Sequence, residues 1–127
     1  MRHEVSLAVD RKAPTLARGF LASVAEAPWF ASRRDDAELA LGELVANAVV
    51  HGDGSGNGGV IRVVVDSDQQ RLRIEVEQPG SARGARVAEP RIEGRPGGWG
   101  LRLVEGVTDK WGAEAGPPGR VWFEIRP

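Results

Sequence analysis

The sequence predicts an α/β fold in which one sheet of about five strands is covered on one face by three helices. Short segments alternate apolar and polar residues, which is the period of a strand with one buried face. Longer segments repeat apolar residues every three or four positions, which is the period of an amphipathic helix. The segments follow the order β-α-α-β-β-α-β-β, and a two-layer sandwich is the natural packing of that set.

Length and composition limit the class of protein. The 127 residues fit one domain over 1–127, and the net charge of -1 disfavours nonspecific nucleic-acid binding. No apolar run approaches the roughly 20 residues of a membrane span, and Met1-Arg2-His3 lacks the apolar core of a signal peptide. We therefore expect a cytoplasmic protein that binds neither membrane nor nucleic acid. The absence of cysteine excludes disulfides and thiolate chemistry.

A strand and two helices are predicted in the first half of the chain. Val5, Leu7 and Val9 alternate with smaller residues and predict a strand that ends at the turn 10–14. An amphipathic helix follows over 15–27, and its apolar stripe consists of Leu16, Phe20, Leu21 and Val24. A second helix begins near Asp35 or Asp36, whose carboxylates suit the positive end of a helix, and runs to about Val50.

The second half begins with a glycine-rich loop over 52–59 and a β-branched strand over 60–65. A turn at 67–70 and an alternating strand over 72–76 complete a hairpin. Segment 78–98 is rich in Pro, Gly, Ala and Arg, and we interpret it as a lid, with a solvated loop as the alternative. A third helix from Gly100 to Val107 precedes strands at 111–115 and 121–125, which a Gly-Pro-Pro-Gly turn separates.

The second helix carries a polar stripe. Glu43, Asn47 and His51 are spaced by four residues, so at about 100° per residue they line one face. An apolar group lies on the opposite side and consists of Leu41, Leu44, Val45 and Ala48. The solvated face of an ordinary surface helix shows the same pattern, so the spacing alone leaves both interpretations open.

Two motifs resemble those of a known family. The string Glu43-Leu-Val-Ala-Asn-Ala-Val-Val-His-Gly52 resembles the N box of the GHKL superfamily, which contains gyrase, histidine kinases and anti-sigma kinases. The string Gly98-Trp-Gly-Leu101 resembles the family's second glycine box, which ends a lid and begins a helix. The boxes, the hairpin and the lid occur in the family's order over nearly the whole chain. The resemblance implies a Bergerat-type ATP-binding fold with a mixed, mostly antiparallel sheet.

The resemblance also implies roles for individual residues. Asn47 would coordinate an Mg²⁺ ion that bridges the phosphates of ATP, and Glu43 would act as general base. His51 would approach a phosphate, with a structural hydrogen bond at the helix end as the alternative. Backbone amides and a helix N-terminus would bind phosphate at the glycine boxes, where the implied residues are Gly80, Gly98, Gly100, Leu101 and Arg102.

The two positions that would read adenine depart from the family's pattern. Gln78 stands where the family has an aspartate that accepts from the adenine amino group, and Arg120 stands where a threonine often follows the glycine. A glutamine amide can accept from the amino group and donate to a ring nitrogen, although it is one methylene longer. Gln78 is therefore retained as a nucleotide-binding residue, and weak nucleotide affinity is the alternative.

Among the members of the superfamily, the chain is most similar to stand-alone anti-sigma-factor serine/threonine kinases. That resemblance implies a sigma factor and an anti-anti-sigma factor as partners, and phosphoryl transfer to a serine. The alternative is an interaction module of the same fold with weak or no ATP binding, which Gln78 favours. Homodimers are common in this class, and Trp29 and Phe30 are either candidates for the contact surface or core residues.

Overall fold

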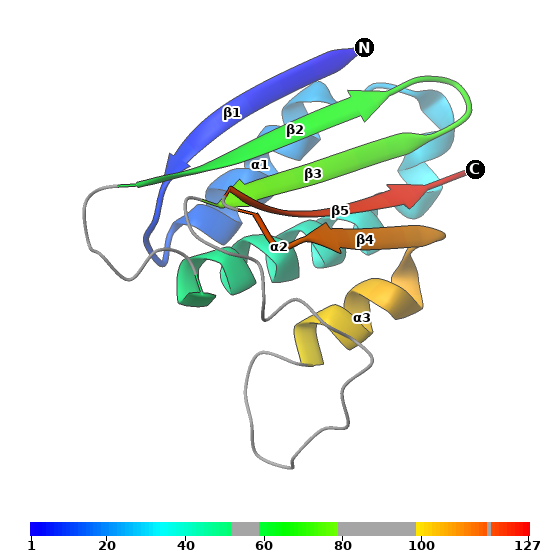
Figure 1. Ribbon diagram of the computed structural model, residues 1–127. Helices are drawn as coiled ribbons and strands as arrows, with labels where there is room; N and C mark the ends of the chain where they lie inside the picture. The colour runs from blue at the N-terminus through cyan, green and yellow to red at the C-terminus, as the bar shows by residue number, and fades with distance from the viewer. Residues whose placement is uncertain (52–58, 79–98, 117) are drawn as a thin grey trace.

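The computed structural model describes residues 1–51, 59–78, 99–116 and 118–127. Their five-stranded sheet carries its helices on one face (Figure 1), which confirms the predicted two-layer α/β fold. The strand order is β1-β2-β3-β5-β4, and every pairing between neighbouring strands is antiparallel. The expectation of a mixed sheet is therefore wrong for the described strands. Two helices separate the first strand from the second, so the chain returns to the end where it left the sheet and pairs in the opposite direction.

The predicted segments occur in the predicted order. They are β1 (Arg2–Ala8), α1 (Ala13–Val24), α2 (Arg34–His51), β2 (Val60–Ser67), β3 (Leu72–Gln78), α3 (Trp99–Val107), β4 (Lys110–Glu114) and β5 (Gly119–Ile125). A 3₁₀ helix, η1 (Pro28–Arg33), was not predicted. From the sequence, Pro28 was expected only to end the first helix. A proline also suits the first position of a new helix, because the N–H at that position would make no hydrogen bond within the helix. The predicted lid lies almost entirely outside the described residues.

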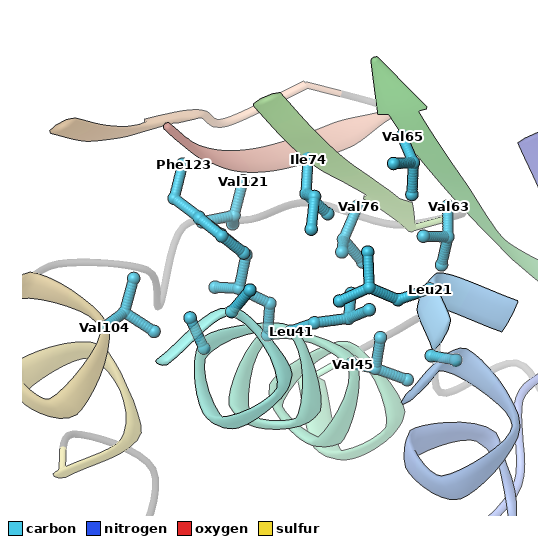
Figure 2. Packing of buried hydrophobic residues seen from close by; sticks show 14 of the residues in the cluster. Leu21, Leu41, Val45, Val63, Val65, Ile74, Val76, Val104, Val121 and Phe123 are labelled. Atoms are coloured by element: carbon cyan, nitrogen blue, oxygen red, sulfur yellow. The ribbon is translucent and has the colours of Figure 1, made fainter. Parts of the chain in front are cut away.

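The hydrophobic core lies between the sheet and the helices (Figure 2). Strands β2, β3 and β5 direct alternate residues into it, and α2 contributes the predicted apolar group. Leu41, Leu44, Val45 and Ala48 are each at most 1% exposed. The hairpin of β2 and β3 is confirmed, with Val63 opposite Val76 and Val65 opposite Ile74.

The predicted stripe of α1 is confirmed for Leu21, which is buried, and for Phe20 and Val24, which pack against the core, but it is wrong for Leu16. Ala13, Ala17 and Leu21 are fully buried, whereas Leu16 is 55% exposed. Residues 13, 17 and 21 are four apart and form one stripe, and small side chains in that stripe allow α1 to approach α2 closely. The prediction that Leu16 is buried rested on the spacing of large apolar residues and left alanine out.

The residues around η1 belong to the core. Phe30 is 2% exposed, so the core interpretation holds for this residue. Trp29 is partly buried, packs edge-on against Phe30 with ring centroids 6.2 Å apart, and donates from Nε1 to the carbonyl of Asp68 at 3.0 Å. Both aromatic rings therefore tie η1 to the body of the domain.

Candidate functional site

Glu43 and Asn47 lie on one flank of α2 and are both partly buried. The outermost surface of this helix carries Leu39, which is 40% exposed, and Val50, which is 72% exposed. The polar stripe therefore lies between the core face and the solvent face, not opposite the core as the sequence suggested. His51 is the last residue of α2, and its side chain lies outside the described part of the structure.

The flank that carries the two polar residues is the one toward α3. Gly42 faces α1, because a Cβ built there would come within 2.4 Å of the Arg18 guanidinium. Asn47 follows Gly42 by five residues, which places it about 140° further round the helix. Figure 2 shows α1 and α3 on the two sides of α2. Asn47, with Glu43 one turn before it, is thus directed away from α1 and toward the α3 side.

The local sequence of α2 favours a stable helix and places Glu43 and Asn47 close together. Asp35 and Asp36 lie in the first turn, where carboxylates interact favourably with the positive end of the helix. Glu43 and Asn47 are four residues apart, so their Cβ atoms are about 6 Å from each other. A carboxylate and an amide oxygen can therefore act on the same small group of atoms.

The site residues meet at one end of the molecule. In Figure 1 the C-terminal half of α2, the first turn of α3, the end of β3 and the start of β5 all lie at the same end. Helix α3 packs against α2 in the opposite direction, so its N-terminus lies toward the half of α2 that carries Asn47. Gly100 and Leu101 are in the first turn of α3, and Arg102 is exposed. Gly80 and Gly98 lie outside the described residues.

Gln78 is the last residue of β3 and is 5% exposed. Side chains alternate along a strand, so Gln78 is on the same face as Val76 and Ile74, which point into the core. Its amide is therefore directed to the helix side of the sheet, next to the end of the molecule where the other site residues gather. Gln78 thus lies at the end of the molecule where the C-terminal half of α2 and the start of α3 also lie.

Arg120 lies on the other face of the sheet. It is opposite Glu77 in the pairing of β3 with β5, and its Nε donates to the Glu77 carboxylate at 3.0 Å. Glu75 and Glu114 lie 3.5 and 3.4 Å from the same guanidinium. The hydrogen bond to Glu77 and the surrounding carboxylates raise the pKa of Arg120 above its ordinary value. Arg120 is therefore held on the outer surface, away from the helix layer.

The donor set on α2 fits a magnesium ion that is shared with phosphate. Among residues 1–51, 59–78, 99–116 and 118–127, no three His, Asp or Glu side chains form a group that could hold a metal ion. Asn47 offers an amide oxygen, and Glu43 offers a carboxylate one turn away. Mg²⁺ prefers oxygen ligands and usually keeps several waters, so one or two protein oxygens plus phosphate oxygens complete its shell.

Arg33 was not singled out from the sequence, although it organises the far end of the same helix pair. Its guanidinium donates to Asp36 on α2 and to the carbonyl of Val107, the last residue of α3. The signal in the sequence was a basic residue three positions before an aspartate at a helix start. That spacing predicts the contact with Asp36 but gives no indication of the contact with α3.

Comparison with known proteins agrees with this geometry. The family model described as the histidine kinase-like ATPase domain matches residues 7–121 of the chain. A search of curated proteins finds no match. None of the helices that the structure describes is long and apolar enough to cross a membrane. With the fold, the α2 pair and a match over most of its length in agreement, the chain belongs to the histidine kinase-like ATPase domain family.

Proposed function

We propose that this protein binds ATP with Mg²⁺ beside α2 and α3 and transfers the γ-phosphoryl group to a serine or threonine of a regulatory protein. The observation that carries the proposal is the pair of Glu43 and Asn47 on the α3 flank of α2, at the end where α3 begins. Membership of the histidine kinase-like ATPase domain family supports ATP as the nucleotide. In this site Asn47 and the phosphates would hold the metal, which offsets negative charge when it is bound.

The proposed chemistry is phosphoryl transfer. The bond between the γ-phosphorus and the oxygen that bridges it to the β-phosphate breaks, and an ester bond forms to the hydroxyl oxygen of the acceptor. Glu43 accepts the hydroxyl proton, and ADP leaves with the bridging oxygen. Backbone amides in the first turn of α3 bind phosphate oxygens, and the dipole of this nine-residue helix favours negative charge there.

The proposed partners follow from the resemblance to anti-sigma-factor kinases. In that arrangement the protein holds a sigma factor and phosphorylates an anti-anti-sigma factor in the cytoplasm. The homodimer common in that class belongs to the same proposal. Phe30 is withdrawn from its contact surface, because the residue is buried in the protomer.

The second candidate function is a binding module that keeps the fold without catalysis. Two observations favour it. Gln78 occupies the helix-facing position where the resemblance implies an aspartate, and Arg120 is engaged by Glu77 on the opposite face. A glutamine in place of a carboxylate weakens base recognition by about 1 to 3 kcal/mol if its amide is mismatched with the base. Such a protein would sequester its partner and release it by other means.

Phosphoryl transfer is tested with γ-labelled ATP and an anti-anti-sigma protein as acceptor. We expect Glu43→Gln to lower the transfer rate about 100-fold or more, while ATP affinity changes little, because only the proton acceptor is lost. Glu38→Gln is the matched control, since Glu38 is also partly buried on α2 but lies about 140° from Glu43. Equal effects of the two variants, or full activity in Glu43→Gln, would contradict the role of Glu43. Partner binding without transfer by the wild type would favour the binding module.

The adenine position is tested by comparing Gln78→Asp with Gln78→Asn. We expect Gln78→Asp to tighten ATP binding about tenfold, since a carboxylate accepts strongly from the adenine amino group. Gln78→Asn has the same length as the aspartate without its charge, so it isolates the contribution of the carboxylate. Calorimetry of ATP against each variant gives the comparison. If Gln78→Asp binds ATP no more tightly than Gln78→Asn, position 78 does not read the base.

A further inference from the structure

The Arg33 guanidinium contacts four groups and so joins three separate segments of the chain. Its Nε lies 3.2 Å from the Asp36 carboxylate in the first turn of α2. Its Nη2 donates to the carbonyl of Val107, at the end of α3, at 3.2 Å. Its Nη1 donates to the carbonyl of Arg126, after β5, at 2.8 Å, and lies 3.5 Å from the Asp109 carboxylate. One side chain therefore ties α3 both to α2 and to the C-terminal end of the chain.

The chemistry of these contacts requires arginine at position 33. A guanidinium presents five N–H donors in a fixed plane, so it can serve two carbonyls and two carboxylates at once, which a lysine ammonium cannot do with the same geometry. The last carbonyls of a helix have no intrahelical donor, and the end of a helix dipole that attracts a cation is its C-terminus. Arg33 supplies both the donor and the charge to α3. Its side chain is 25% exposed, so these contacts are only partly screened by water.

Other contacts fix the same end of α3. Thr108 directs its backbone N–H and its Oγ1 to the carbonyl of Val104, at 3.1 and 2.7 Å. The Asp109 carboxylate accepts from the Arg126 amide at 2.7 Å, and the Asp109 amide donates to the carbonyl of Glu124 at 2.9 Å. Val104 is fully buried and anchors the middle of the helix (Figure 2). These contacts hold α3 to its surroundings from Val104 to its C-terminus.

The geometry of α3 converts a small change at that end into a displacement at the other. A nine-residue helix is about 13 Å long, so a tilt of about 5° about its C-terminus moves its N-terminus by about 1 Å. The N-terminus is the end that lies toward the C-terminal half of α2 (Figure 1), the half of that helix to which Asn47 belongs. A displacement of about 1 Å between groups that act on the same ligand lowers a rate by about 100-fold, which shows how narrow the tolerance is.

We propose that Arg33 is a positioning residue for the nucleotide site, because it fixes the C-terminus of α3 against α2 and thereby sets the distance between the α3 N-terminus and Asn47. This inference rests on the proposed ATP-binding function. Arg33 itself touches no nucleotide and acts from the opposite end of the helix pair.

The experiment compares wild type, Arg33→Met, Arg33→Lys and Arg34→Met by hydrogen exchange and by calorimetry of ATP with Mg²⁺. Arg34→Met is the matched control, because the Arg34 guanidinium lies over the Phe30 ring of η1, 5.6 Å from its centroid, and not at the end of α3. We expect Arg33→Met to speed amide exchange in α3 at least about tenfold while exchange in β3 changes less than about threefold, and to weaken ATP binding at least about fivefold. Arg33→Lys keeps the positive charge but lacks the planar set of guanidinium donors. We therefore expect it to recover less than about half of the ATP affinity that Arg33→Met loses, on a logarithmic scale.

Several outcomes would overturn the inference. Uniform acceleration of exchange in α2, α3 and β3 would make Arg33 a residue of general stability only. Faster exchange in α3 with unchanged ATP affinity would show that ATP binding does not depend on how Arg33 positions α3. Full recovery by Arg33→Lys would mean that charge alone accounts for the effect. A wild-type protein that binds no ATP contradicts the proposed function, whereas wild-type binding that Arg33→Met retains in full contradicts only the role of Arg33.

Discussion

Asp68 organises the turn between β2 and β3. Its Oδ1 accepts from the backbone amides of Gln70 and Arg71, at 2.7 and 3.0 Å, and its own amide donates to the carbonyl of Arg71. The hydrogen bonds from these amides lower the pKa of Asp68 below its ordinary value, because they favour the charged carboxylate. The hydrogen bond from Gln70 has the largest effect on this pKa. The carbonyl of Asp68 also accepts from Trp29, which links the turn to η1.

This lowered pKa predicts a pH-dependent contribution to stability. A carboxyl group whose pKa is lower in the folded than in the unfolded state stabilises the fold above the unfolded pKa, and the contribution is lost as pH falls through the folded pKa. We therefore expect the melting temperature of wild type to exceed that of Asp68→Asn most at neutral pH. The difference should shrink between about pH 5 and pH 2. Asp66→Asn, in the same hairpin, is the control. A difference that stays constant or grows on acidification would contradict this account of the turn.

For single residues, the sequence could predict which side chains share a helix face but not the direction of every side chain. Glu43 and Asn47 share a helix face by spacing alone, and the structure keeps them on one flank. Arg120 could not be assigned to a face in advance, because alternation gives a direction only when the first residue of the strand and its register are known. Pairing of Gln78 with Gly119 fixes that register and places Arg120 beside Glu77. The positions of Gly80 and Gly98 remain predictions.

At the scale of elements, strands β4 and β5 are in close contact on the outer face of the sheet through the Trp122 ring and Gly112. Trp122 is paired with Gly112, and the Arg73 guanidinium lies over the Trp122 ring, 4.1 Å from its centroid. A Cβ built on Gly112 would meet three atoms of the indole at 2.7 to 2.8 Å. The ring therefore fills the space that a side chain at position 112 would occupy.

That contact predicts different effects for two glycine substitutions. Gly112→Ala should lower the free energy of unfolding by about 1 to 3 kcal/mol, because the indole and the Arg73 stacked on it must both move. Gly42→Ala is the comparison. Its new Cβ meets only the end of the flexible Arg18 side chain, and alanine gains about 1 kcal/mol of helix propensity, so the net change should stay within about 1 kcal/mol. Chemical denaturation measures both. Equal destabilisation by the two substitutions would mean that the Trp122 ring moves aside as easily as the Arg18 side chain.

The packing of α1 gives a second prediction at this scale. Leu21 is 0% exposed and Leu16 is 55% exposed, although the two residues have the same side chain on the same helix. Leu21→Ala should cost about 2 to 5 kcal/mol, because it leaves a cavity against α2 and the sheet. Leu16→Ala should change the free energy of unfolding by no more than about 0.5 kcal/mol. Comparable losses in urea denaturation would show that Leu16 is covered in solution.

Element order was predictable because each segment had a clear period, whereas the burial of Ala13 and Ala17 and the presence of η1 were not predictable from that period. Alanine contributes little to a hydrophobic pattern, yet Ala13 and Ala17 are fully buried in the face of α1 that packs into the core. The order β3-β5-β4 was equally inaccessible, since strand alternation says which face is buried and nothing about which strand is the neighbour.

At the scale of the whole molecule, α2 connects two ends with different roles. One end of the helix pair consists of the C-terminal half of α2, which includes Asn47, and the first turn of α3 (Figure 1). At the other end Arg33 donates to the carbonyl of Val107, the last residue of α3. The core of the sheet holds α2 rigidly along its length, with Leu41 and Val45 fully buried. The proposed nucleotide site lies at the first end, and the contacts that we propose to position it lie at the second.

Calorimetry of ATP binding to the purified protein, with and without Mg²⁺, tests the central claim most directly, with Asn47→Ala as the paired variant. Val49→Ala is the control, because Val49 is also partly buried on α2 and carries no group that could bind a metal. We predict micromolar binding to wild type and to Val49→Ala that requires Mg²⁺. We predict at least about a tenfold loss in Asn47→Ala, because in the proposed site the amide oxygen is a metal ligand. Binding that is indifferent to Mg²⁺ and to Asn47, or no binding at millimolar ATP, would contradict the proposed site.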